Sequence, residues 1–105
     1  MLAGKLMRSA PDYAQTQAVK LLSCIVRRVS VREAKWLLGD VGELLRDCFG
    51  DASADLRKNV VFCIVEFYAK VDTQTAEEYL RTLTKSQEKL ARIYIKRREE
   101  RAFLM

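Results

Sequence analysis

Apolar residues recur at spacings of three and four along almost the whole chain, which is the pattern of helices that each pack on one side. The segment from Asp12 to Val29 carries such a stripe, and Pro11 and Asp12 suit the first turn of a helix. The residues expected to face inward there are Ala14, Ala18, Leu21, Leu22, Ile25, Val26 and Val29. No segment shows the alternation of a strand, so the pattern predicts an all-α fold.

Further stripes predict four more helices. They run from Arg32 to Phe49, from Ala54 to Val71, from Thr75 to Leu83, and onward from about Ser86, with Leu90, Ile93 and Tyr94 facing inward in the last. Gly50 to Ser53 supplies a glycine stop followed by N-cap candidates. After Ile95 the sequence KRREER places charge on every face, so we expect the last helix to project into solvent there or to fray over residues 99–105.

An internal repeat organises these helices. At an offset of 39 residues, Cys24, Ile25 and Val26 coincide with the identical tripeptide Cys63, Ile64 and Val65. At the same offset Val41 and Leu44 coincide with Leu80 and Leu83. A period near 40 with two helices per unit is typical of HEAT repeats. We therefore predict that residues 1–105 form a single HEAT-like domain, a right-handed α-solenoid of about five antiparallel helices. In this pattern the helix that ends at Phe49 is the first of a repeat and the helix from Ala54 is its second. The opening helix from Asp12 is then the second half of a preceding repeat.

The composition argues against catalysis and metal binding. The chain contains no histidine, the commonest general base and a frequent zinc ligand. Its three cysteines, Cys24, Cys48 and Cys63, lie far apart within apolar stripes, so we expect buried free thiols. We predict no enzymatic activity, no cofactor and no structural metal. No apolar run is long enough to span a membrane, which predicts a cytosolic or nuclear protein.

The net charge of +5 is concentrated near the carboxyl end and favours an acidic partner. Seven basic residues stand against three acidic ones between Lys85 and Arg101: Lys85, Lys89, Arg92, Lys96, Arg97, Arg98 and Arg101. The simplest interpretation is that this basic helix is a charged extension exposed to solvent. The alternatives are binding to an acidic adaptor segment, to the acidic surface of a microtubule, or to nucleic acid, although no nucleic-acid motif is present.

Individual residues outside that helix are also candidates. Arg57 follows Asp51 at the distance found in HEAT turns, which favours an internal contact, whereas Lys58 points elsewhere and is the better binding candidate. Trp36 lies just off its stripe, so it is either an exposed anchor for a partner or packs on a preceding repeat. The cluster Arg27, Arg28 and Arg32 is read as a solvated helix end or as an acidic-partner site.

The segments LRKNVVFCIVEFYAKV and YLRTLTKSQEKLARIYIKR resemble the C-terminal end of the cytoplasmic linker-associated proteins, the CLASP family. The matching positions are Leu56, Arg57, Lys58, Val61, Phe62, Cys63, Val65, Leu80, Leu83, Ser86, Leu90, Tyr94, Ile95, Lys96 and Arg97. With APDYAQTQAVKLLSCIVRRVS, the likeness extends over about residues 10–98. Glu66 and Phe67 depart from it, because smaller residues are expected there.

The resemblance implies a TOG-like, non-catalytic module that recruits adaptor proteins within a microtubule plus-end and spindle-associated protein. The implied partners are cytoplasmic linker proteins, kinetochore or midzone proteins, and cortical or Golgi anchors, with microtubules reached through the parent protein. It implies a cytoplasmic, cytoskeletal location and no cofactor, membrane or nucleic acid, and a homodimer is left open. We expect partner contacts from Trp36, Lys58, Lys89, Arg92, Lys96, Arg97 and Arg98. The alternative function is a basic module that binds polyanions.

Overall fold

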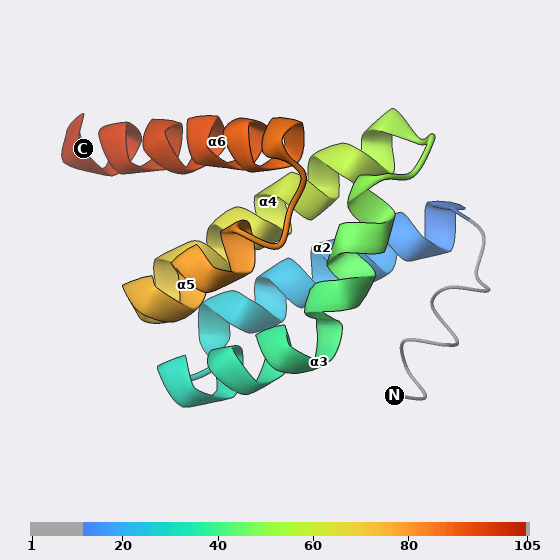
Figure 1. The fold of residues 1–105 in the computed structure, drawn as a ribbon. Coiled ribbons are helices and arrows are strands. Elements are labelled where there is room, and N and C mark those ends of the chain that lie inside the picture. Colours follow the sequence, from blue (N-terminus) through green and yellow to red (C-terminus); the bar gives the residue numbers. More distant parts are fainter. Residues whose placement is uncertain (1–11, 105) are drawn as a thin grey trace.

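A computed structural model of the chain describes residues 12–104, with side chains over residues 13–102. In this range the chain folds as α2 (Asp12–Arg28), α3 (Val31–Phe49), α4 (Ala54–Lys70), α5 (Thr73–Leu80) and α6 (Lys85–Leu104), and no strand is present (Figure 1). The predicted all-α, HEAT-like fold is confirmed. The right-handed sense of the solenoid stays a prediction.

Side-chain caps set where the helices begin. Ser30 accepts a hydrogen bond from the backbone N–H of Glu33, whose carboxylate accepts one from Ser30 N–H in return, and Ser53 caps α4. The turn at residues 50–53 is therefore as predicted. The short helix α5 begins two residues before the predicted Thr75, because the Asp72 carboxylate accepts from the Thr75 N–H and hydroxyl. It ends at Leu80 rather than at Leu83.

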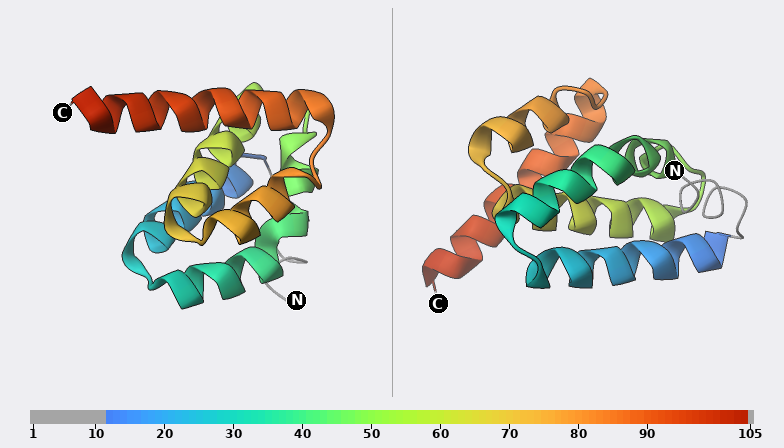
Figure 2. Two further views of the ribbon diagram at one scale, coloured as in Figure 1. Left: turned by 60° about the vertical axis from the view of Figure 1, so that its left-hand side comes forward. Right: turned by 90° about the horizontal axis from the view of Figure 1, so that it is seen from below.

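The helix α4 lies at the centre of the molecule and packs against α2, α3, α5 and α6 (Figures 1 and 2). Its apolar residues form the middle of one continuous core. The most deeply buried large side chains of that core are Val19, Val26, Leu45, Leu56, Val60, Cys63, Ile64, Phe67 and Leu80. The helix is apolar on more than one face because it has neighbours on several sides.

A close contact joins α3 to α5. The Tyr79 hydroxyl donates to the carbonyl oxygen of Gly42 at 2.7 Å, and a Cβ atom at Gly42 would lie 2.8 Å from the Tyr79 ring. A glycine is therefore needed for this approach. Nearby, the Arg46 guanidinium donates to the Thr82 hydroxyl at 2.8 Å. These contacts connect the first helices of two successive repeats.

The predicted inward face of α2 is wrong for three of its seven residues. Ala14, Leu21 and Ile25 are exposed, with 62% of Leu21 and 40% of Ile25 accessible, whereas Val26 is buried as expected, and so is Val19. Ala18, Leu22 and Val29 are half-buried. Among the described helices, the main neighbour of α2 is α4, so no other described helix covers much of its apolar surface. For the same reason Cys24 is exposed, which contradicts the prediction, while Cys48 and Cys63 are buried as predicted.

The last helix also differs from expectation in its buried face. Ala91 and Ile95 are buried against the core, whereas Leu90 and Ile93 are each 39% exposed and Tyr94 is half-buried. The helix continues to Leu104, and every described side chain after Ile95 is exposed. The predicted fraying of residues 99–105 stays a prediction. No helix within residues 12–104 is long and apolar enough to cross a membrane.

Arg57 stabilises the turn between α3 and α4, in a way that differs in detail from the prediction. Its guanidinium donates to the backbone carbonyl oxygens of Asp51 at 2.6 Å and Ala52 at 2.9 Å. The Asp51 carboxylate instead accepts from the Ser53 N–H at 2.8 Å. Arg57 is thus an internal, structural residue.

Candidate functional site

A groove of about 520 Å³ runs between α2, α4 and α6, and we call it the basic groove. It is lined by Ser23 and Arg27 of α2, by Phe62, Val65 and Glu66 of α4, and by Tyr94, Arg97, Arg98 and Arg101 of α6. Four of these nine residues are arginines and one is acidic, so the groove is strongly positive. Its position follows from the fold, because α4 forms the floor while α2 and α6 rise on either side.

An aromatic pair forms part of that floor. The rings of Phe62 and Tyr94 meet edge to face with centroids 5.8 Å apart. A cation lies over each ring: Lys58 Nζ is 5.8 Å from the Phe62 centroid, and the Arg97 guanidinium is 5.2 Å from the Tyr94 centroid. Phe62 is 40% exposed although aromatic side chains favour burial. The result is a partly open apolar surface with positive charge at both ends.

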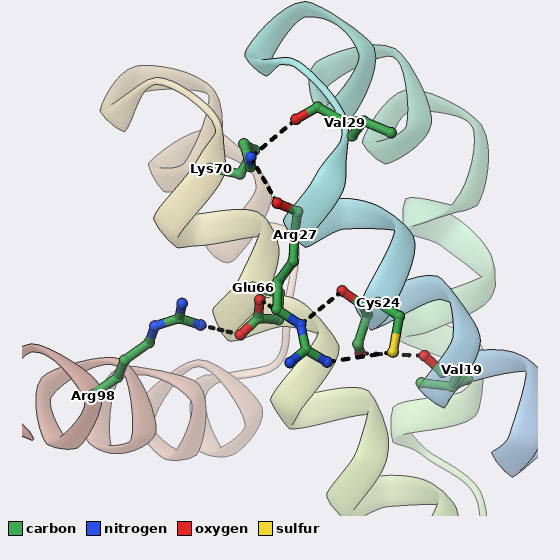
Figure 3. A network of polar contacts seen from close by, with 8 residues as sticks. Val19, Cys24, Arg27, Val29, Glu66, Lys70 and Arg98 are labelled. Atoms are coloured by element: carbon green, nitrogen blue, oxygen red, sulfur yellow. Dashed lines mark hydrogen bonds and ion pairs between the residues drawn. The ribbon is translucent and has the colours of Figure 1, made fainter. Parts of the chain in front are cut away.

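Glu66, on the floor of the groove, connects α4 to the helices on both sides, as Figure 3 shows. Its carboxylate pairs with Arg27 Nε of α2 at 3.3 Å and with Arg98 Nη1 of α6. The Glu66 side chain is only 14% exposed, whereas 55% of Arg27 and 44% of Arg98 remain accessible. The two guanidiniums therefore converge on one point while part of each still faces solvent.

The same region fixes the end of α2. Lys70 Nζ donates to the backbone carbonyl oxygens of Arg27 at 3.1 Å and Val29 at 2.9 Å (Figure 3). Carbonyls at a helix C-terminus have no partner within the helix, and a cation there is favoured by the helix dipole. Arg27 also donates to the Cys24 sulfur at 3.5 Å. The backbone that carries Arg27 is thereby held against α4.

A second, shallower depression lies on the other flank of α6, lined by Lys85, Glu88, Lys89, Arg92, Ile93 and Lys96. Here Arg92 binds Glu77 of α5 through two hydrogen bonds, of 2.8 and 3.1 Å, and Glu88 at 2.9 Å. The hydrogen bonds that Arg92 donates lower the pKa of Glu77, and because both carboxylates accept from Arg92 the pKa of Arg92 is raised. Arg92 therefore joins α5 to α6.

The structure divides the predicted site residues among three places. Lys58, Arg97 and Arg98 lie at the basic groove, whereas Lys89, Arg92 and Lys96 line the second depression. Lys58 therefore lies on a different surface of the molecule from Lys89 and Arg92. Trp36 lies on α3, away from both, and is 66% exposed, so it stays a candidate anchor.

Sequence reasoning missed Phe62 and Arg27 as members of one site. Both were visible in the pattern, Phe62 as a matching position of the resemblance and Arg27 as part of a basic cluster, yet no spacing rule brings residues 35 positions apart together. Within residues 12–104, no group of three or more cysteines and carboxylates is placed to bind a metal ion.

Comparison with known proteins finds relatives with similar sequences, although no family model matches the chain. CLIP-associating protein 1-A of Xenopus laevis is 30% identical over 92 residues, and CLIP-associated protein of Arabidopsis thaliana is 34% identical over 92 residues. CLIP-associating protein 1 of Xenopus tropicalis is 29% identical over the same length. Each match covers 88% of this chain, and the chain spans about 6% of the length of each relative.

Proposed function

Because the chain belongs to the family of CLIP-associating proteins, the CLASPs, we propose that it is a non-catalytic module that recruits adaptor proteins within a microtubule-associated protein. The relatives are named for association with CLIPs, so a cytoplasmic linker protein is the first partner to test. Kinetochore, midzone and cortical adaptors are further candidates. The proposed location is the microtubule cytoskeleton, including the spindle.

The observation that carries this proposal is the basic groove. An amphipathic helix binds a protein groove by placing its apolar residues on the floor and its polar residues at the rim. Phe62, Val65 and Tyr94 offer an apolar floor, and arginines flank it on α2 and α6. A partner segment that is helical, apolar on one side and acidic on the other matches both properties. Long-range attraction by the arginines would speed its approach.

The structure also indicates which substitutions test this proposal cleanly. Arg97 and Arg101 are exposed and form no ion pair with any described residue, so their reversal to Glu leaves the fold intact. Lys89 and Lys96, on the other flank of the same helix, provide a control with the same change in charge. Arg98 is less suitable because it pairs with Glu66.

The probe is a fluorescent peptide with leucines at i, i+3, i+4 and i+7 and glutamates between them, compared with a scrambled peptide of the same composition. In stopped-flow anisotropy, Arg97→Glu with Arg101→Glu should slow association about tenfold, whereas Lys89→Glu with Lys96→Glu should have a small effect. Pull-down of a cytoplasmic linker protein from extract should follow the same order. Equal effects of the two pairs would place the partner surface elsewhere, with Trp36 the next candidate.

The same measurements separate adaptor binding from the alternative, binding to a polyanion such as the microtubule surface. Polyanion binding depends on many phosphate or carboxylate contacts and weakens steeply as salt rises. Docking on the apolar floor weakens much less. An equal affinity for the striped and the scrambled peptide, lost together at high salt, would favour the polyanion alternative.

A further inference from the structure

The cations that line the basic groove are all of one kind. Arg27, Arg97, Arg98 and Arg101 line it, whereas Lys58 lies outside this lining, over the Phe62 ring, and the lysines of α6 are not part of the lining either. A guanidinium presents a planar set of donors that matches the oxygens of a carboxylate or a phosphate, whereas an ammonium acts as a point charge. The lining therefore favours a ligand with several acceptor oxygens.

Much of this donor capacity is not used by the residues that the structure describes. Of the nitrogens of Arg98, only Nη1 contacts the Glu66 carboxylate, and Arg97 lies over the Tyr94 ring without an ion pair to any described residue. The Arg101 side chain is exposed and forms no hydrogen bond or ion pair with any residue in the described range. Arg97 and Arg101 are one helical turn apart, so their side chains are neighbours on α6. Arg98 lies beside them and is held in place by Glu66.

Charge indicates what kind of oxyanion fits. With one glutamate against four arginines, the groove keeps a large positive excess after the Glu66 pairs have formed. A single carboxylate neutralises one charge. A phosphorylated serine or threonine carries about −1.5 to −2 at neutral pH and three strong acceptor oxygens, so it can contact several guanidiniums at once.

We propose that the α6 side of the groove is a phosphate-binding site, in which Arg97, Arg98 and Arg101 bind a phosphorylated serine or threonine of the partner segment. This deepens the proposed function, since the partner is then one whose recruitment is switched on by phosphorylation. Glu66 acts here as a positioning residue: through its pairs with Arg27 and Arg98 it holds the Arg98 guanidinium at the groove instead of free in solvent.

The test uses three versions of the amphipathic probe peptide that differ at one position, carrying serine, phosphoserine or glutamate. The phosphoserine peptide should bind the chain about tenfold more tightly than the serine peptide, with glutamate between them. Arg101→Gln should remove most of that preference, and Arg101→Lys should restore only part of it although the charge is kept. Lys96→Gln, which removes the same charge outside the groove, should leave it unchanged.

A second readout does not depend on any peptide. Titration with inorganic phosphate should shift the NMR signals of the Nε–H groups of Arg97, Arg98 and Arg101 more than those of Arg92, and acetate at equal ionic strength should not. If serine and phosphoserine peptides bind equally, the phosphate site is wrong while the adaptor groove stands. If no peptide binds but phosphate shifts these signals, the groove function fails and the anion site stands. If phosphate moves all arginine signals alike, the site is overturned.

Discussion

The helices α2 and α4 carry the same tripeptide, Cys-Ile-Val, at equivalent positions of the repeat. The first two residues of the tripeptide differ in solvent exposure between the two copies. Cys63 is fully buried and Ile64 is 2% exposed, whereas Cys24 is exposed and 40% of Ile25 is accessible. The difference arises from neighbours, because α4 packs against every other described helix while α2 packs chiefly against α4. The burial of a repeated motif is thus decided by its place in the stack.

The largest expected contrast between the two copies is in thiol reactivity. Burial raises the pKa of Cys63 to about 12, and its sulfur is inaccessible, so it should react only when the core opens. Cys24 should react with a maleimide or a disulfide reagent at pH 8 on the order of a thousandfold faster than Cys63. Peptide mapping by mass spectrometry measures both rates in one sample. Similar rates would mean that α4 is not the protected centre.

Truncation of the two isoleucines gives the next largest contrast. Ile64→Ala should lower the free energy of unfolding by about 3 kcal/mol, because it removes buried methyl groups and leaves a cavity near Leu38 and Phe67. Ile25→Ala should cost less than about 1 kcal/mol, since much of that side chain is already in water. Urea denaturation of both variants checks this. A large loss from Ile25→Ala would show that the exposed face of α2 is covered in solution.

The ion pairs between the two helices should contribute less. At the repeat offset of 39, Arg27 and Glu66 are equivalent positions, and they pair with each other across the interface. Glu66→Gln should lower the free energy of unfolding by about 1 kcal/mol, a modest value because Arg27 and Arg98 are half-exposed. Glu100→Gln, exposed on α6, is the matched control. A double-mutant cycle with Arg27→Gln isolates the pair; a coupling of zero would contradict its role.

The smallest expected effect on stability concerns Phe62, which stands in α4 at the position that a polar serine occupies in α2. Ser23 of α2 is buried, and its hydroxyl donates to the Val19 carbonyl oxygen at 3.2 Å, whereas its equivalent in α4 is the partly exposed Phe62. Phe62→Leu should change the free energy of unfolding by under about 1 kcal/mol and still weaken binding of the amphipathic peptide several-fold. Calorimetry and anisotropy on the same protein measure both. An unchanged affinity would remove Phe62 from the groove floor.

The helices and their pairing could be predicted from the sequence, but the exposed surfaces could not. Spacings of three and four gave the helices to within a few residues, and the tripeptide offset gave the correspondence of α2 with α4. Periodicity defines how wide an apolar face is, yet it does not say what lies against that face, which is why Leu21 and Ile25 were placed in the core. Helix caps such as Ser53 could be predicted from the local sequence.

The floor and the opposite wall of the groove were beyond prediction for a similar reason. The basic character of α6 was evident, and Arg97 and Arg98 were named, but a groove needs a second wall. Phe62 lies on α4, which packs directly against α6, and Arg27 lies on α2, which is placed beside the groove by its own packing on α4. Arg92 looked equivalent to its basic neighbours, and only the position of Glu77 on α5 gives it an internal role.

The central position of α4 also bears on how the chain folds. In long solenoids each repeat touches only its neighbours, so the array can unfold in steps. Here α2, α3, α5 and α6 all rest on one helix, so none of them has a full apolar partner until α4 has formed. We expect α4, with the helices nearest to it, to form the folding nucleus, and substitutions at Ile64 to slow folding more than those at Ile25. A chain built from repeats would then cross a single barrier, as compact globular domains do.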